Sequence, residues 1–78
     1  MAERTIRDTF HLVMALKDRG RIFPQFGPAG KSTNWYVEYG DPENPYVERV
    51  LAPLVKTLEN EGRLERIGIY FFLLPSEE

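Results

Sequence analysis

The side chains of this 78-residue chain that could carry acid–base or metal chemistry are one histidine and several loosely grouped carboxylates. His11 has Asp8 three residues before it, and the other grouped acids are Asp41, Glu43, Glu59, Glu61 and Glu65. A metal site needs more ligands than one imidazole, and the chain has no cysteine. Acid–base catalysis needs two groups facing one another across a cleft, which this spacing does not demand. We therefore predict no catalytic residue, no metal ligand, no cofactor and no enzymatic activity, and interpret His11 as a helix-margin residue or a pH-sensitive contact.

A partial phosphate-loop pattern lies in the middle of the chain. Gly30, Lys31 and Ser32 match the end of G-x-x-x-x-G-K-[ST], but Gln25 stands where the first glycine belongs. Such a loop holds phosphate at the N-terminus of a helix, whereas the residues after Ser32 have the pattern of a strand. We interpret residues 25–32 as part of a hairpin loop in which Lys31 can contact an anion.

Aromatic residues on expected strands, with arginines nearby, suggest a platform for single-stranded RNA. Tyr36, Tyr70 and Phe72 would form the platform, and the basic contacts to an anion or nucleic acid would be Arg21, Lys31, Arg63 and Arg66. The segment 66–73 partly follows the K/R-G-F/Y-G/A-F-V-x-F/Y signature but has Ile67 and Ile69 at two of its key positions. The net charge of −2 also argues against nucleic acid. This reading is therefore kept as the alternative.

The hydrophobic spacing predicts the element order α-β-β-α-β. We expect a helix over 5–19, capped by Thr5 with Asp8 as its partner and ended by Gly20. An edge strand over 21–26, interrupted by Pro24, and a strand over 34–39 follow. The second helix is expected over 46–61, kinked at Pro53, and a closing strand over 64–74, bent at Gly68.

The segment 54–71 resembles the end of a winged-helix domain. It reads as a recognition helix, a glycine and two short wing strands about Gly68. The resemblance implies DNA binding and would place a short helix between Gly20 and Pro45, where the sequence has the strand pattern Trp35-Tyr-Val-Glu-Tyr39. The exposed face of that recognition helix would mix both charges, which does not suit DNA; its residues are Glu48, Arg49, Lys56, Glu59 and Asn60.

We predict one α+β domain over residues 1–78, with a frayed tail at 76–78, a three-stranded, mainly antiparallel sheet and both helices on one face; a winged helix is the alternative. The expected core joins sheet residues Trp35, Val37, Ile69, Phe71 and Leu73 to helix residues Phe10, Val13, Leu51, Leu54 and Leu58. The last strand is apolar on both faces, so its second face should meet a partner. The predicted interface is Tyr36, Tyr70, Phe72 and Leu74.

The function expected from this pattern is a small, soluble, non-catalytic protein-interaction module that forms a homodimer. Sheet-edge pairing through 22–26 is a second route to association. Three function classes stay open: the interaction module, a nucleic-acid-binding regulator, and a ligand binder or enzyme whose pocket at a dimer seam would include Tyr36, Tyr70 and His11. The charged first residues lack a signal-peptide core, and no apolar run reaches membrane-spanning length, so we expect a cytoplasmic protein without membrane contact.

Overall fold

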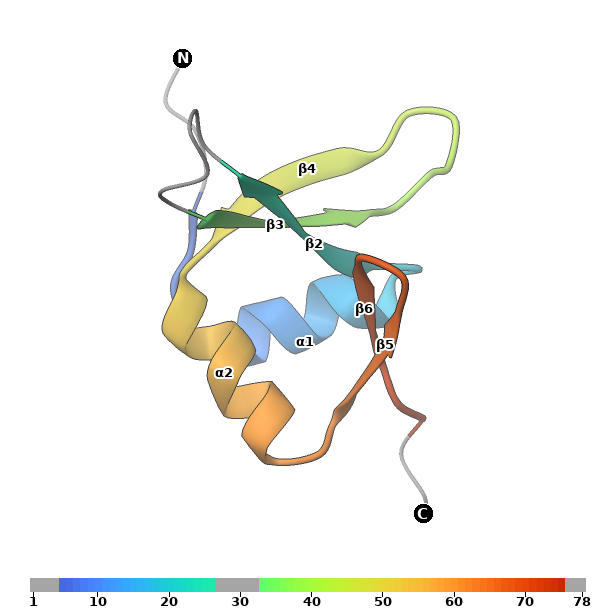
Figure 1. The fold of residues 1–78 in the computed structure, drawn as a ribbon. Coiled ribbons are helices and arrows are strands. Elements are labelled where there is room, and N and C mark those ends of the chain that lie inside the picture. The colour runs from blue at the N-terminus through green and yellow to red at the C-terminus, as the bar shows by residue number, and fades with distance from the viewer. Residues whose placement is uncertain (1–4, 27–32, 76–78) are drawn as a thin grey trace.

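The computed structural model of the protein describes residues 5–26 and 33–75. These form two helices and six strands (Figure 1). In chain order the elements are β1 (Thr5–Ile6), α1 (Thr9–Lys17), β2 (Arg21–Phe26), β3 (Thr33–Tyr39), β4 (Tyr46–Val50), α2 (Ala52–Asn60), β5 (Leu64–Ile67) and β6 (Tyr70–Leu73).

All six strands belong to one mixed sheet in the order β1-β4-β3-β2-β6-β5. The pair β1–β4 is parallel, and every other pair is antiparallel. Both helices lie on the same side of the sheet, below β2, β3 and β4 in Figure 1, and α1 contacts β3 and β6. The α+β class and the one-sided helices are confirmed, whereas the three-stranded sheet was an undercount.

The first helix is shorter than the sequence pattern indicated. Asp8 is extended (φ −139°, ψ 160°) and its carboxylate accepts the backbone N–H of His11 at 2.8 Å, so Asp8 is the N-cap. Thr5, predicted to be the cap, lies in β1 instead. Past the helix, the left-handed residue is Arg19 (φ 60°) rather than Gly20.

The strong helical period over 46–61 conceals a strand followed by a helix. Residues 46–50 form β4, and α2 begins at Ala52, so Pro53 lies in the first turn of the helix. Proline is favoured there because its missing N–H has no intrahelical partner to lose. The predicted kink is therefore wrong, because Pro53 starts the helix and does not interrupt it.

The closing segment is a hairpin and not one bent strand. β5 and β6 pair from Leu64↔Leu73 to Ile67↔Tyr70, and Gly68 adopts φ +63° in the turn between them. The helix, glycine and hairpin of the winged-helix resemblance are thus present. The region where that family has a short helix, however, forms β2 and β3, and the hairpin joins the sheet through Ile22↔Phe71.

The core lies between the sheet and the helices. Its buried side chains are Ile6, Leu12, Ala15, Leu16, Ile22, Val37, Val50, Val55, Leu58 and Phe71. Of the predicted core, Val37, Leu58 and Phe71 are confirmed, and the residues that pack against it partly buried are Val13, Trp35, Leu54 and Leu73. Phe10, Leu51 and Ile69 are exposed, so their core assignment was wrong. Phe10 is on the outer side of α1, and Leu51 and Ile69 lie between elements.

Candidate interaction face

The side of the sheet opposite the helices carries outward side chains from all six strands. Directly paired residues share a face, so the register defines this open face. Its members are Thr5, Arg21, Phe23, Gln25, Asn34, Tyr36, Glu38, Val47, Arg49, Glu65, Ile67, Tyr70 and Phe72. Within residues 5–26 and 33–75, both helices lie on the other side, as Figure 1 shows.

Four aromatic rings form a continuous cluster at the centre of the open face. Phe23 stacks on Tyr36 with ring centroids 5.8 Å apart, and meets Tyr70 edge-on at 6.2 Å. Tyr70 in turn lies 6.4 Å from Phe72. The four rings come from β3, β2 and β6 and are half-buried. Their exposed surfaces therefore form one apolar patch that crosses three strands.

Arg21 fixes one end of this cluster. Its Nε and Nη2 donate to the same carboxylate oxygen of Glu38 at 3.0 and 2.8 Å. Its guanidinium also lies 4.3 Å from the centroid of the Tyr70 ring, within the range of a cation–π interaction. The two side chains remain 41% and 28% exposed, so the pair contributes little stability but holds the guanidinium over the aromatic surface.

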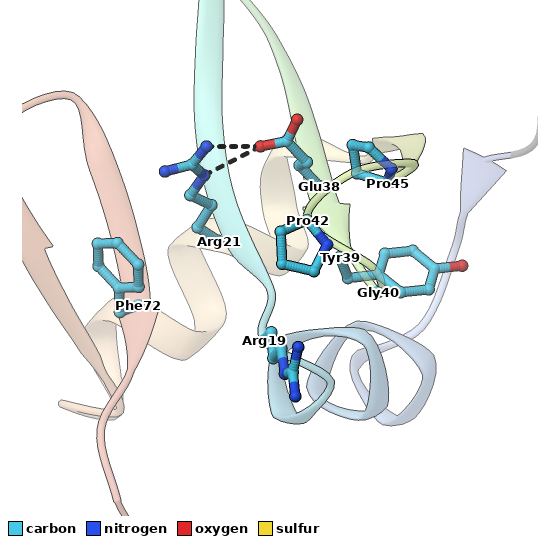
Figure 2. A pocket seen from close by; sticks show the side chains of 8 residues that line it. All are labelled: Arg19, Arg21, Glu38, Tyr39, Gly40, Pro42, Pro45 and Phe72. Atoms are coloured by element: carbon cyan, nitrogen blue, oxygen red, sulfur yellow. Dashed lines mark hydrogen bonds and ion pairs between the residues drawn. The ribbon is translucent and has the colours of Figure 1, made fainter.

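A hollow of about 280 Å³ opens at the same end of the face. Figure 2 shows Phe72 on one side, Pro42 and Pro45 of the β3–β4 turn on the other, and Arg21 with Glu38 between them. Its remaining lining residues are Arg19, Tyr39 and Gly40. The turn is tied to α1 because the Gly40 N–H donates to the Asp18 carbonyl at 2.9 Å. The hollow therefore combines apolar walls with charged side chains of both signs, and a backbone hydrogen bond ties the turn on one side of it to α1.

Three of the four residues predicted for the interface share the open face. Tyr36, Tyr70 and Phe72 do so, while Leu74 follows the end of β6 and lines a different hollow with Lys17 and Arg63. Phe23 was missed, although the alternation Arg21, Phe23, Gln25 would have placed it on the same face as Arg21. Pro24 concealed this alternation by marking the segment as an edge. β2 is in fact interior, between β3 and β6.

The predicted basic contacts do not form one surface. Arg21 lies on the open face, Arg63 is in the loop before β5 and has a 3.6 Å contact with Glu61, and Lys31 lies outside the described residues. Arg66 pairs with Phe71 in the register and so shares the helix-side face, where its Nε donates to the Gly68 carbonyl at 3.1 Å. No stripe joins these side chains within the described part of the chain.

His11 has a structural partner. Its Nδ1 lies 2.7 and 2.9 Å from the two carboxylate oxygens of Asp8, and both side chains are well exposed. The backbone N–H of His11, and then its ring, hold the pKa of Asp8 below its ordinary value of 3.8. Tyr36 and Tyr70 lie on the open face and His11 on the helix layer, so the described residues of one chain do not bring all three together in a pocket.

Neither a metal cluster nor a membrane span appears in the described residues. No group of three or more possible ligands is found among them, and none of their helices has the length and apolar character needed to cross a bilayer. Of the partial phosphate-loop pattern, Gln25 belongs to β2, and residues 27–32 lie outside the described ranges. No protein-family model, curated protein or solved structure matches the chain.

Proposed function

We propose that this protein is a small non-catalytic module that associates with a second copy of itself through the open face. The observation that carries the proposal is the continuous cluster of Phe23, Tyr36, Tyr70 and Phe72 on a side of the sheet that no described helix covers. Exposed Val47 and Ile67 extend the apolar surface at its two margins, with exposed fractions of 50% and 56%. Contiguous apolar patches of this kind mark contact surfaces.

The charges of the open face favour a second copy over another occupant. Two arginines, Arg21 and Arg49, and two glutamates, Glu38 and Glu65, lie on it, so its net charge is zero. In a dimer with two-fold symmetry the same surface is used by both copies and must be complementary to itself. A balanced set of both signs meets this requirement, because each cation of one copy can face an anion of the other.

The same balance makes the nucleic-acid alternative the weaker candidate. Single-stranded nucleic acid binds a positively charged groove with aromatic stacking surfaces. Here Arg21 is engaged by Glu38, Arg49 donates to Asn34 at 3.0 Å, and two glutamates share the face. The aromatic rings meet one requirement, but the charge does not meet the other.

A cytoplasmic location is part of the proposal. Small extracellular domains of this size are usually stapled by disulfides, and this chain has no cysteine. Self-association is another means of stabilising a domain of 78 residues. Cell fractionation would test the location, and recovery in a secreted or membrane fraction would contradict it.

The test of self-association is the molar mass in solution by light scattering on a sizing column, over a concentration series. We expect about twice the chain mass of 9.1 kDa at high concentration. Phe72→Glu buries a charge in the proposed interface and should give a monomer with unchanged circular dichroism. Phe10→Glu is the matched control, because Phe10 is 68% exposed on α1, away from the open face.

Two results would contradict the proposal. One is a wild-type protein that stays monomeric throughout the series. The other is an equal loss of dimer in Phe72→Glu and Phe10→Glu, which would place the interface elsewhere or reflect a general effect of charge.

A further inference from the structure

The exposed Ile67 side chain lies on the edge strand β5 of the open face, and the hollow lined by Phe72 and Pro42 lies toward the β3–β4 turn. Ile67 pairs with Tyr70 at the start of β6, while Phe72 is two residues farther along that strand, about 7 Å away. Arg21 lies in the row of Phe72, since Ile22 pairs with Phe71. An apolar projection on β5 and a recess with apolar and charged lining thus lie on one surface, one row of side chains apart along the strands.

The backbone beside the projection is shaped by the hairpin turn. Gly68 takes φ +63° in the turn after Ile67, and the Arg66 Nε donates to its carbonyl at 3.1 Å. Ile67 itself is branched at Cβ, which restricts its rotamers. A side chain that is already ordered loses less entropy on insertion into a recess, so this position is suited to an anchor.

The size of the face indicates that a dimer needs contacts beyond the flat surface. The five strands other than β1, about 4.8 Å apart and with two or three outward residues each, give a flat footprint of roughly 300–400 Å². A standard interface buries about 800 Å² on each partner. A contact confined to the flat face, which already includes Ile67, therefore falls short, and contacts that reach into the hollow beside it are needed for a stable complex.

We propose that each copy inserts Ile67 into the hollow of its partner, so that two identical anchor contacts flank the aromatic cluster. This inference rests on the proposed self-association. The hollow of about 280 Å³ is several times the ~30 Å³ that a water molecule occupies in the liquid. Its walls suit an aliphatic side chain, because Phe72, Pro42 and Pro45 are apolar and the arginine stems add methylene groups.

In a dimer with two-fold symmetry, the contact of Ile67 with the hollow of the partner occurs twice. Because the projection and the recess are on the same surface, a rotation that brings Ile67 of one copy to the hollow of the other also brings the reverse pair together. The alternative of edge pairing through β5 is disfavoured by charge. Two symmetric antiparallel registers give the most overlap of β5 with β5 of a second copy. One of them places Glu65 opposite Glu65 of the other copy, and the second places Arg66 opposite Arg66, so each sets like charges against one another.

The experiment compares Ile67→Ala with Ile69→Ala by sedimentation or sizing over a concentration series. The two isoleucines are 56% and 54% exposed and flank the same glycine, but only Ile67 lies on a strand within the open face. We expect the dimer dissociation constant to rise at least about tenfold for Ile67→Ala, as for a truncated hot-spot residue, and less than about twofold for Ile69→Ala.

A second measurement uses the absence of native cysteine. Ile67→Cys and Pro42→Cys are prepared separately and mixed under mild oxidation. A disulfide-linked species of twice the chain mass that forms more readily in the mixture than in either variant alone supports the inference. A dimer that persists while both alanine variants behave alike, without preferred cross-linking in the mixture, overturns it and leaves the proposed function standing. A monomeric wild-type protein overturns both.

Discussion

Gly20 is the position where a single added methyl group should be most costly. A Cβ built there would lie 2.3 Å from the Ala15 carbonyl oxygen and 2.7 Å from the Leu16 Cα, where contacts of 3.4 Å or more are ordinary. The obstacles are backbone atoms of the last turn of α1, which cannot rotate away. Gly20→Ala therefore requires α1 and β2 to move apart by about 1 Å, the difference between 3.4 and 2.3 Å.

The expected cost follows from the clash and from the hydrogen bonds beside it. Overpacking of this kind costs about 1–3 kcal/mol. The Gly20 N–H bond to the Leu16 carbonyl (3.1 Å) and the Gly40 bond to Asp18 (2.9 Å) lie in the segment that must move, and each contributes about 1 kcal/mol. We expect Gly20→Ala to lower the free energy of unfolding by about 3–5 kcal/mol, out of roughly 4–12 kcal/mol for a chain of this length.

The matched control is Gly62→Ala. Gly62 adopts φ +71° but has no atom within 4 Å of an added Cβ, so only the left-handed backbone is penalised, by about 1–2 kcal/mol. Urea unfolding followed by circular dichroism and by the fluorescence of Trp35, the only tryptophan, measures both. An equal loss of stability in the two variants would refute the reasoning, as would a Gly20→Ala protein as stable as the wild type.

Two further substitutions test the core and the cap of α1. Leu58→Ala should lower the free energy of unfolding by about 2–5 kcal/mol, because Leu58 is fully buried. Leu51 is 36% exposed, so Leu51→Ala should lower it by less than about 1 kcal/mol. Urea unfolding measures both, and the opposite ranking would contradict the observed start of α2. Since the folded pKa of Asp8 is lowered, its carboxylate stabilises the fold above its unfolded pKa, and this contribution is lost as pH falls through the folded value. Asp8→Asn keeps a capping oxygen but cannot titrate, so its stability should fall less steeply on acidification than that of the wild type; an unchanged acid slope would rule out this role for Asp8.

The sequence pattern predicted which side of the sheet a strand residue points to better than it predicted where helices and strands begin and end. The alternation of Tyr70, Phe71, Phe72 and Leu73 assigned each side chain to the correct side of β6, because strand geometry leaves only two directions. The same alternation in β3 identified Tyr36 as outward and Val37 as buried. Most of the candidate face could therefore be found from local patterns alone.

The boundary between β4 and α2 could not be seen in the hydrophobic pattern, because the apolar residues of the strand and of the helix together follow one helical period. Val50, Val55 and Leu58 have helical spacing, yet Val50 is buried from a strand and the other two from a helix. The chain turns between them, so both elements present apolar side chains to one core. Pro53 was the local signal for this boundary, since proline favours the first turn of a helix over its interior.

The remaining errors concern pairings between distant residues, for which a single sequence has little signal. β1 is two residues long and exists as a strand because Thr5 and Ile6 pair with Arg49 and Val50. The interior position of β2 depends on the pair Ile22↔Phe71. Neither partner can be identified from propensity or periodicity, because both properties describe only the local chain.

The parallel pairing of β1 with β4 has a consequence for how the chain closes on itself. Thr5 and Arg49 are 44 positions apart, whereas Arg21 and Glu38 in the β2–β3 hairpin are 17 apart. The chain entropy lost on closure grows with the logarithm of this separation, so the longer closure costs about 0.8 kcal/mol more. Two pairs of residues must offset that cost, with Ile6 and Val50 supplying buried apolar surface. The pairing of the first strand therefore depends on tertiary burial, because two residue pairs must offset the longer closure.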